Sequence, residues 1–486
     1  MGASRTTRRK VALGHSAGGQ VDVTGLRLTP RGGHPLGALA FVLFFGTSPG
    51  ASAETLESAL ARAYGGNPTL GAQRASVRAT DENVPRALSL GRPRVSATAD
   101  AGVQFSQSRS PNGTEQSETT FPRGAGVQID QTLFNGNRTL NSTRQAESQV
   151  LGARETLRNT EQTVLFNGAQ AYMNVLRDTA ILNLQRNNVE VIEEQLRQTR
   201  DRFNVGEVTR TDVAQAEARL AAAQSQVSLA ESNLRASIAL FRQVIGVQPR
   251  QLAPGRPLDR LLPRSVDAAV AAGLREHPAI LAAFHAVDVA ELQVKVTEGE
   301  LFPTVGVTAS ASERFDVQTV GDSRFTASAV ARLTVPIYEG GEVYARVRQA
   351  KETVGQRRIE AEITRDQVRA TVFSAWGQLE ASRAQILAAQ AQVQAAEIAL
   401  SGVREEARVG QRTTLDVLNA QQELLTARVN LITAQRDRVV NSYAVVQAMG
   451  RLSTRALGLN IAQYSPKVHF DQVKDLWIGV RTPDGR

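Results

Sequence analysis

One motif occurs twice in this chain, and this repeat limits the possible folds more than any other feature. The first copy covers Phe203 to Gln215 and the second covers Arg408 to Asn419. In each copy a glycine, Gly206 or Gly410, follows a long helical pattern. Glycine is common just beyond a helix C-terminus because it adopts positive φ angles without steric cost. Each copy therefore predicts the end of a long helix.

A second helix is predicted to begin directly after each glycine. Thr209-x-x-Asp212 and Thr413-x-x-Asp416 match the capping box. In this motif the hydroxyl accepts a hydrogen bond from a free amide of the first turn, and the acidic side chain accepts one from the backbone of the capping residue. Each copy is therefore predicted to be the tip between two antiparallel helices.

Further markers extend the duplication to both halves of the chain. Phe134-Asn-Gly136 corresponds to Tyr338-Glu-Gly340, and Arg92-Pro-Arg-Val95 corresponds to Phe302-Pro-Thr-Val305. A repeat of this length is too long for a small solenoid unit, so it indicates one domain built from two homologous halves. We expect five segments: a signal peptide (1–53), a first repeat (54–247), a proline-rich linker (248–264), a second repeat (265–454) and a C-terminal tail (455–486).

The first 53 residues resemble an export signal. An apolar run from Leu36 to Phe45 follows basic residues, and Ala51-Ser-Ala53 is a small-x-small cleavage pattern before Glu54. The run is too short to span a bilayer permanently. We therefore expect an exported mature chain, with a shorter leader if translation starts downstream of Met1.

The composition excludes several kinds of chemistry. The chain has no cysteine, which excludes disulfides, thiol nucleophiles and a lipid-anchored N-terminal cysteine. Beyond the leader only His277, His285 and His469 remain, and no two of them have metal-ligand spacing. No phosphate-binding loop or nucleophile elbow is present. Since the leader holds six basic residues and one acidic residue, the mature net charge falls from +9 to +4. We expect no enzyme activity, cofactor, metal or nucleic acid.

The hydrophobic period changes to two in four stretches, namely 94–106, 127–133, 304–312 and 326–335. Strands of about ten residues with one apolar and one polar face are typical of a transmembrane barrel. The alternative is two half-buried hairpins of a soluble sheet. Four strands cannot enclose a water-filled lumen, so a pore would need several chains. Gln131 interrupts the alternation, and residues 107–124 are expected to be a surface loop.

Long helices are predicted after each pair of strands. Residues 342–408 contain no proline, and apolar residues recur there every seven positions from Val372 to Leu400. Residues 213–241 repeat the pattern, with alanines three positions further on. Such heptads indicate coiled-coil packing, and alanine permits close antiparallel approach. A helix of 67 residues would be about 100 Å long. Residues 55–90 are also expected to be helical, whereas the tail is assigned no element and its Trp477 either packs on the helices or is disordered.

These tips, with the junctions Leu133-Phe-Asn-Gly136 and Val335-Pro-Ile-Tyr-Glu-Gly-Gly341, resemble the TolC family of outer-membrane channel tunnels. The resemblance covers nearly the whole mature chain. It implies an α plus membrane-β fold: a homotrimeric, twelve-stranded barrel in the outer membrane, with four strands per chain, continued by a helical barrel through the periplasm. It further implies a passive exit duct for proteins or small toxic compounds, docked to a periplasmic adaptor and to an inner-membrane transporter of the ABC or RND type.

The resemblance also implies a gate at the helical tips. The family's entrance lock maps to Asp212 and Arg412, which would form an ionic link between helices, and Asp416 maps to an acidic ring. Asn419 stands where that ring has a second aspartate, and Ala407 where the lock has a tyrosine. We therefore expect weaker cation preference and weaker block by multivalent cations. Alternatively, the two aspartates serve only as helix-start carboxylates.

A soluble periplasmic adaptor is the alternative function. Such a protein also has a long helical hairpin, but a single one flanked by compact β domains. By family analogy, the missing lipid anchor favours protein secretion over drug efflux.

Overall fold

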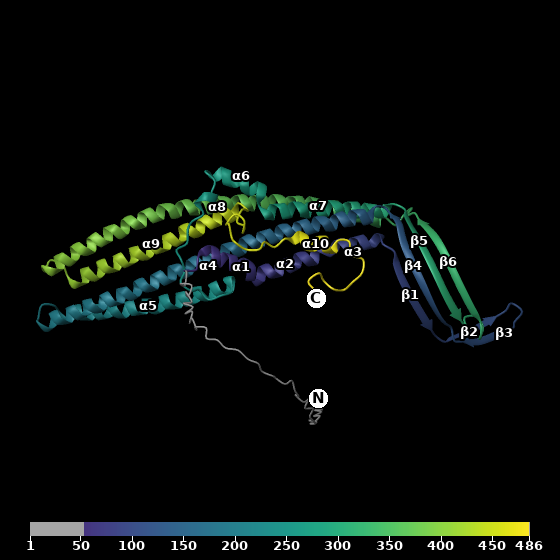
Figure 1. The fold of residues 1–486 in the computed structure, drawn as a ribbon, viewed down its shortest axis with the longest axis horizontal. Coiled ribbons are helices and arrows are strands. Elements are labelled where there is room, and N and C mark those ends of the chain that lie inside the picture. Colours follow the sequence, from purple (N-terminus) through teal and green to yellow (C-terminus); the bar gives the residue numbers. More distant parts are fainter. Residues whose placement is uncertain (1–52, 486) are drawn as a thin grey trace, which may run out of the picture. The chain divides into compact units, whose positions relative to one another are not determined.

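The computed structural model describes residues 53–485, so nearly all of the expected signal peptide lies outside the described part of the chain. The described chain is mostly helical, with strands at one end and two long helical hairpins leading to the other (Figure 1). The first half contains α1 (Leu56–Gly66), α2 (Pro68–Asp81), α3 (Asn83–Leu88), β1 (Arg94–Ala101), β2 (Gln104–Arg109), β3 (Glu115–Thr120), β4 (Arg123–Asn135), α4 (Arg138–Asn204) and α5 (Arg210–Ile245). The second half contains α6 (Val266–Glu276), α7 (Pro278–Glu298), β5 (Thr304–Phe315), β6 (Ser323–Thr334), α8 (Glu342–Arg408), α9 (Thr414–Ala448) and α10 (Pro466–Val473).

The two halves repeat the same order of elements. In each half short helices precede two strands of the main sheet, and a helix of 67 residues, α4 or α8, follows them. Each long helix then turns back into a shorter one, α5 or α9, to form an antiparallel hairpin (Figure 1). The predicted duplication is therefore visible in the fold. None of the described helices has the length and apolar character needed to cross a membrane.

The helical segment expected over 55–90 is divided into three helices. Asn67 separates α1 from α2, and its side-chain oxygen accepts a hydrogen bond from the Thr69 amide at 2.9 Å. Pro68 is the first residue of α2, where the missing N–H costs nothing, although the same residue cannot continue the hydrogen bonds of α1. The expectation of one continuous helix was therefore wrong, and the cause is an Asn-Pro start signal.

The four main strands form one antiparallel sheet in the order β1-β4-β5-β6. The register pairs apolar residues with each other, as in Val95 with Ile129 and Ala309 with Ala329. Polar residues pair in the same way, as in Ser310 with Ser328. One face is thus apolar and the other polar, as predicted. A bulge between Thr132 and Phe134 shifts the register two residues beyond the interruption at Gln131.

The outer end of the first strand pair differs from the expectation. The stretch 94–106 was expected to be one strand, but β1 ends at Ala101 and β2 begins at Gln104. Between them the Gly102 amide donates to the Pro122 carbonyl at 2.8 Å, and the main sheet ends at this hydrogen bond. Beyond this point β2 and β3 form a separate two-stranded hairpin, which takes up the end of the expected strand and most of the expected loop. Short polar residues thus formed a hairpin where the sequence indicated only a loop.

The main hydrophobic core lies midway along the helices, where α1, α6 and the C-terminal part of α9 pack against the long helices. Tyr172 is fully buried there, and its hydroxyl lies 2.6 Å from the carbonyl oxygens of Glu54 and Ala253. The linker and the N-terminal end of the described chain are thus joined to α4. Towards the tips the clusters become small, with three buried residues each.

Candidate functional site at the helical tips

Both long helices end in the same way. The residue after the helix is valine, and the next residue, Gly206 or Gly410, has a positive φ angle of 82° or 80°. The Glu207 amide donates to the Arg202 carbonyl at 2.9 Å, and the Gln411 amide donates to the Glu406 carbonyl at 2.9 Å. These bonds satisfy carbonyl groups that the helix itself leaves free. A side chain at either glycine would be strained by the left-handed backbone.

Both returning helices begin with complete capping boxes. The Thr209 amide and hydroxyl donate to Asp212 Oδ2 at 2.9 and 2.7 Å, and the Asp212 amide donates to the Thr209 hydroxyl at 3.3 Å. The second tip repeats this with Thr413 and Asp416 at 2.9, 2.8 and 3.2 Å. The two turns are therefore built from the same local bonds, as expected from the repeated sequence.

The capping bonds determine how the two aspartates titrate. Hydrogen bonds from the Thr209 hydroxyl and backbone lower the pKa of Asp212 below its ordinary value of 3.8. The backbone and hydroxyl of Thr413 lower the pKa of Asp416 in the same way, with a further contribution from the charge of Arg412. A carboxyl group with a lowered pKa stabilises the folded form above its ordinary pKa, and this stabilisation is lost as pH falls through the lowered value.

The helix starts at both tips should therefore be stable to acid over a wide range. From neutral pH down to about pH 4 the caps stay ionised, so we expect constant helical content in far-ultraviolet circular dichroism. Only as the pH falls through the lowered pKa values, which lie below 3.8, do the caps protonate and the helix starts fray, so the helical content should then fall. The control is the double variant Asp212→Asn, Asp416→Asn, which should show no such acid transition. A transition near pH 6.5 would indicate a histidine instead and contradict this assignment.

Arg412 and Asp212 are not joined to each other within the described chain. Arg412 Nε donates to Glu406 at 2.8 Å, on the second tip, whereas Asp212 is held in the capping box of the first tip. The first tip has its own ion pair, between Arg202 and Glu207 at 3.0 Å. Each tip is thus closed by internal contacts, and a direct link between Asp212 and Arg412 stays a prediction.

Asn419 contacts a residue that the sequence did not single out. Its side-chain oxygen accepts a hydrogen bond from Arg219 Nη2 at 2.7 Å, which joins α9 to α5 and so one hairpin to the other. Leu418 reinforces this contact by packing against Leu196 and Ala216 of the first hairpin. No local pattern could have indicated Arg219, because its partner lies 200 positions away. Asn419 therefore lies at the contact between the two hairpins.

Ala407 has a different environment. It is half-buried and packs inside the second hairpin, in a cluster with Leu400, Val417 and Leu424 from the facing helices. A larger side chain at this position would enlarge that cluster, whereas alanine lets α8 and α9 lie close together. Nothing in the described chain places Ala407 beside Asp212, so this residue contributes packing to the tip.

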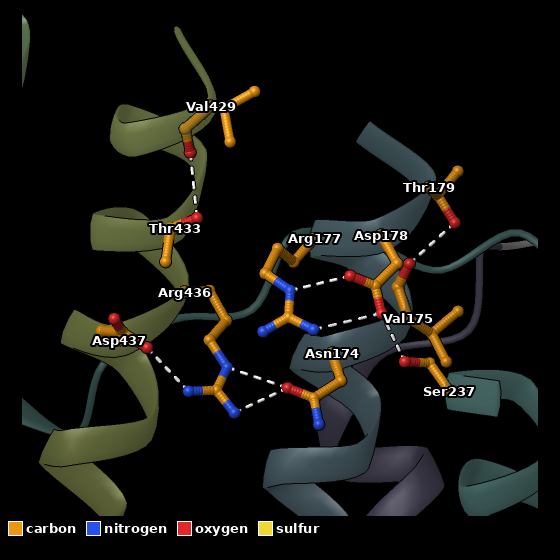
Figure 2. A network of polar contacts seen from close by, with 10 residues as sticks. All are labelled: Asn174, Val175, Arg177, Asp178, Thr179, Ser237, Val429, Thr433, Arg436 and Asp437. Atoms are coloured by element: carbon orange, nitrogen blue, oxygen red, sulfur yellow. Dashed lines mark hydrogen bonds and ion pairs between the residues drawn. The ribbon is translucent and has the colours of Figure 1, made fainter. Parts of the chain in front are cut away.

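Further from the tips, a polar network joins the two hairpins to each other (Figure 2). Arg436 of α9 donates to the Asn174 side-chain oxygen of α4 through Nε and Nη2, at 2.9 and 2.6 Å. One turn further along α4, Arg177 pairs with buried Asp178 at 2.8 Å, and the Ser237 hydroxyl of α5 donates to the same carboxylate. The network links three helices, so the hairpins are held more firmly here than at their tips.

The substitution Arg436→Ala is expected to lower the free energy of unfolding by about 1–3 kcal/mol, because it removes charge-assisted hydrogen bonds between α9 and α4. Circular dichroism of the helices during thermal unfolding would measure the effect. The control is Thr433→Val, since the Thr433 hydroxyl donates to Val429 at 2.9 Å within α9 alone. Equal losses of stability in both variants would contradict a role for Arg436 in joining the hairpins.

Among the described residues no group of histidine and acidic side chains is arranged to hold a metal ion. The tips therefore present charged and hydrogen-bonding side chains at the ends of two helical hairpins.

Comparisons with known proteins agree with this view. The sequence model of a family described as outer membrane efflux protein matches residues 59–247 and 271–451, one segment in each half. The outer membrane efflux protein BepC of Brucella suis is 44% identical over 442 residues, which cover 90% of this chain and 95% of BepC. The outer membrane protein TolC of Escherichia coli is 28% identical, with 87% of each chain covered.

A solved structure shows the same fold. The outer membrane channel CmeC of Campylobacter jejuni superposes with a TM-score of 0.73 at 18% identity, covering 86% of this chain and 89% of CmeC. This likeness concerns the fold alone. It confirms the predicted combination of long helices and membrane strands built from two halves.

Proposed function

This chain belongs to the outer membrane efflux protein family, and on that premise we propose that it is the exit duct of a three-part export system, gated at its helical tips. The resemblance to the TolC family is confirmed, and the protein is an outer-membrane efflux channel, not an enzyme. The soluble adaptor is not supported, since the chain has two long hairpins and an open sheet in place of one hairpin between compact β domains.

The open sheet is the observation that carries the proposal of a trimer. β1 and β6 are the edges of the four-stranded sheet, so each has one row of backbone groups without a partner strand in the described chain. In lipid such groups must be hydrogen-bonded, and a closed barrel is the only sheet that satisfies all of them. Because β1 and β6 run in opposite directions, β6 of one chain can pair antiparallel with β1 of the next. Three chains then give the twelve strands of the proposed barrel.

Cysteine cross-linking tests this assembly without interference from other thiols of the chain, because the natural chain contains no cysteine. Thr98→Cys on β1 combined with Thr326→Cys on β6 places one thiol on the polar face of each free edge, at matching levels of the sheet. Oxidation in outer membranes should give covalent dimers and trimers, with neighbouring positions scanned for the best register. The control is Gln128→Cys with Ser310→Cys, which pair within one chain and should give only monomers. Monomers from every edge pair would contradict the barrel.

The proposed gate rests on side-chain atoms that the contacts within each tip leave available. Arg412 has a half-exposed side chain, and Asp212 uses only Oδ2 in the described capping contacts. In a ring of hairpins, Arg412 of one chain would lie beside the first tip of the next and reach the remaining oxygen of Asp212. Asp416 would contribute to an acidic ring that Asn419 leaves less charged, so we propose weak block by multivalent cations.

The proposed partners are a periplasmic adaptor and an inner-membrane transporter of the ABC or RND type. The name of BepC gives efflux and no cargo, so secreted proteins and small toxic compounds both stay proposals for the cargo. Purification of the channel after cross-linking in its own cells would identify the transporter. Purified protein should also give discrete conductance steps in planar bilayers, and recovery as a soluble monomer without detergent would contradict the proposed duct.

A further inference from the structure

A large cavity lies at the base of the sheet, where the strands meet the helices. The junction itself is visible at one end of the long helices (Figure 1). The cavity has a volume of about 940 Å³, and it is lined by residues of all four strands of the main sheet, by the start of α4 and by the end of α7. The strand residues include Gln128, Thr308 and Ser328 of the polar face. Such a volume is typical of sites for small molecules.

The charged residues of this cavity are mostly arginines. They are Arg92, Arg94, Arg138 and Arg332 against Asp130 and Glu300. Four positive charges against two negative ones give the cavity a net charge of +2. A guanidinium group presents its N–H donors in a planar fork that matches the oxygens of a phosphate or a carboxylate. The lining is therefore suited to an anion.

Both carboxylates of the cavity already have partners in the chain. Asp130 accepts hydrogen bonds from the Gln128 amide at 2.8 Å and from the Thr308 hydroxyl at 2.8 Å. Glu300 pairs with Arg346 of α8 at 2.6 Å, and Arg346 is not among the lining residues. The negative charge of Glu300 is thus balanced by a further arginine from outside the cavity.

Three of the arginines keep donors available. Arg94 and Arg332 are exposed, and their guanidinium groups form no hydrogen bond or ion pair with another described residue. Arg94 stands opposite Asp130 in the pairing of β1 with β4, but the carboxylate has the partners given above. Arg138 lies 3.8 Å from Glu300, and its Nε is buried without a hydrogen-bond partner. Donors without acceptors therefore gather at this cavity.

The fourth arginine is held by the C-terminal tail, to which the sequence assigned no element. Arg92 Nη1 donates to the Leu476 carbonyl at 2.6 Å, and the guanidinium group lies 4.6 Å from the centre of the Trp477 ring. The preceding helix, α10, packs on α2, where His469 Nδ1 lies 2.9 Å from Asp81 Oδ2. The tail thus holds Arg92 in position at the wall of the cavity.

The outer end of the same polar face is different. Arg314 and Arg324 stand opposite each other there, and Arg324 shares the face of Arg332 because an even number of residues separates them on β6. Arg314 pairs with Asp100 at 3.1 Å, and Arg324 donates to the Gln318 side-chain oxygen at 3.3 Å. Among the described arginines of this face, only those at the base lack a partner.

We propose that the cavity at the base of the sheet binds soluble multivalent anions that carry phosphate or carboxylate groups. The inference rests on the proposed function, because in the proposed barrel the polar face lines the lumen, where dissolved anions reach the cavity and lipids do not. Positive charges along a concave wall raise the local concentration of anions. The site favours negatively charged compounds among the cargo, and it is opposite in sign to the acidic ring proposed at the tips.

Block of the ion current by inorganic pyrophosphate tests the site in full-length channels. In planar bilayers we expect pyrophosphate to reduce the current of the parent channel. The double variant Arg94→Gln, Arg332→Gln should raise the half-blocking concentration by about tenfold or more, because each arginine can form charge-assisted hydrogen bonds with the anion. The matched control is Arg314→Gln, Arg324→Gln, which removes the same charge from the outer end of the same face. It should change the half-blocking concentration by less than about twofold.

Binding is also measured without any current. The cavity is formed within one chain, so isothermal titration calorimetry of the full-length protein in detergent should show binding of pyrophosphate even where no channel conducts. This binding should be lost in Arg94→Gln, Arg332→Gln and kept in the control variant.

The results separate the site from the duct. Equal effects of both double variants would show that the total charge of the lumen determines the block, and would overturn the site. Channels that conduct without block and bind no pyrophosphate would overturn the site and leave the duct intact. Binding to a protein that never conducts would support the site and contradict the duct. A protein that neither binds nor conducts would overturn both.

Discussion

Single channels that carry Arg412→Ser should conduct several-fold more current than the parent channel in planar bilayers. Arg412 is one of the cations of the second tip, where it pairs with Glu406 at 2.8 Å and lies close enough to Asp416 to lower the pKa of that carboxyl group. Its removal would leave Glu406 and Asp416 as like charges beside each other. In a closed ring it would also remove the proposed link to Asp212 in all three chains together. The entrance should therefore widen.

The matched control is Arg408→Ser. Arg408 is on the last turn of α8, four residues before Arg412, and its partner Glu405 lies 2.9 Å away on the same helix. This variant removes the same charge from the same tip without affecting the proposed link. Its conductance should equal that of the parent. Equal conductance in both variants and the parent would contradict the role of Arg412 in closing the entrance.

Gly136→Ala should prevent the channel from folding, with a loss of more than about 4 kcal/mol in the free energy of unfolding. Gly136 has a φ angle of 66° at the junction of β4 and α4, and an added Cβ would overlap the Gly299 carbonyl group and lie 3.0 Å from Phe302 Cβ. These neighbours are backbone atoms and a Cβ atom attached directly to the backbone of the second half, so they cannot move aside cheaply. The amount of heat-resistant oligomer in outer membranes would measure the effect.

Gly340→Ala provides the control at the corresponding position of the second half. Gly340 has almost the same φ angle, 64°, but no heavy atom lies within 4 Å of an added Cβ. This variant should cost only the strain of a left-handed residue, about 1–2 kcal/mol, and should still assemble. Similar losses at both positions would show that backbone strain, and not the contact with Gly299, determines the effect.

The sequence predicted elements whose causes are local. The tips follow from Thr209, Asp212 and their counterparts, because the bonds of a capping box join residues three positions apart. The two faces of the sheet follow from strict alternation, which needs no knowledge of the partner strand. Pro68 was a local signal as well, and its meaning as a helix start was missed in favour of one long helix.

Contacts between distant segments could not be predicted in this way. Arg219 meets Asn419, and Arg436 meets Asn174, only because the two hairpins lie side by side, and arginines of the same kind occur all along the solvated faces. The docking of α10 depends on buried Asp81 and His469, which are separated by 388 positions. For the gate, the sequence indicated the residues but not the neighbours that hold each of them within its own tip.

The equal length of α4 and α8 has a consequence for how this protein can change over time. Both helices have 67 residues, so both turns end at the same depth. Loss of one heptad from α4 alone would withdraw the first turn by about 10 Å and leave the rim uneven. Insertions and deletions are therefore tolerated only in matched pairs, and the reach of the protein towards the inner membrane can evolve only in both halves at once.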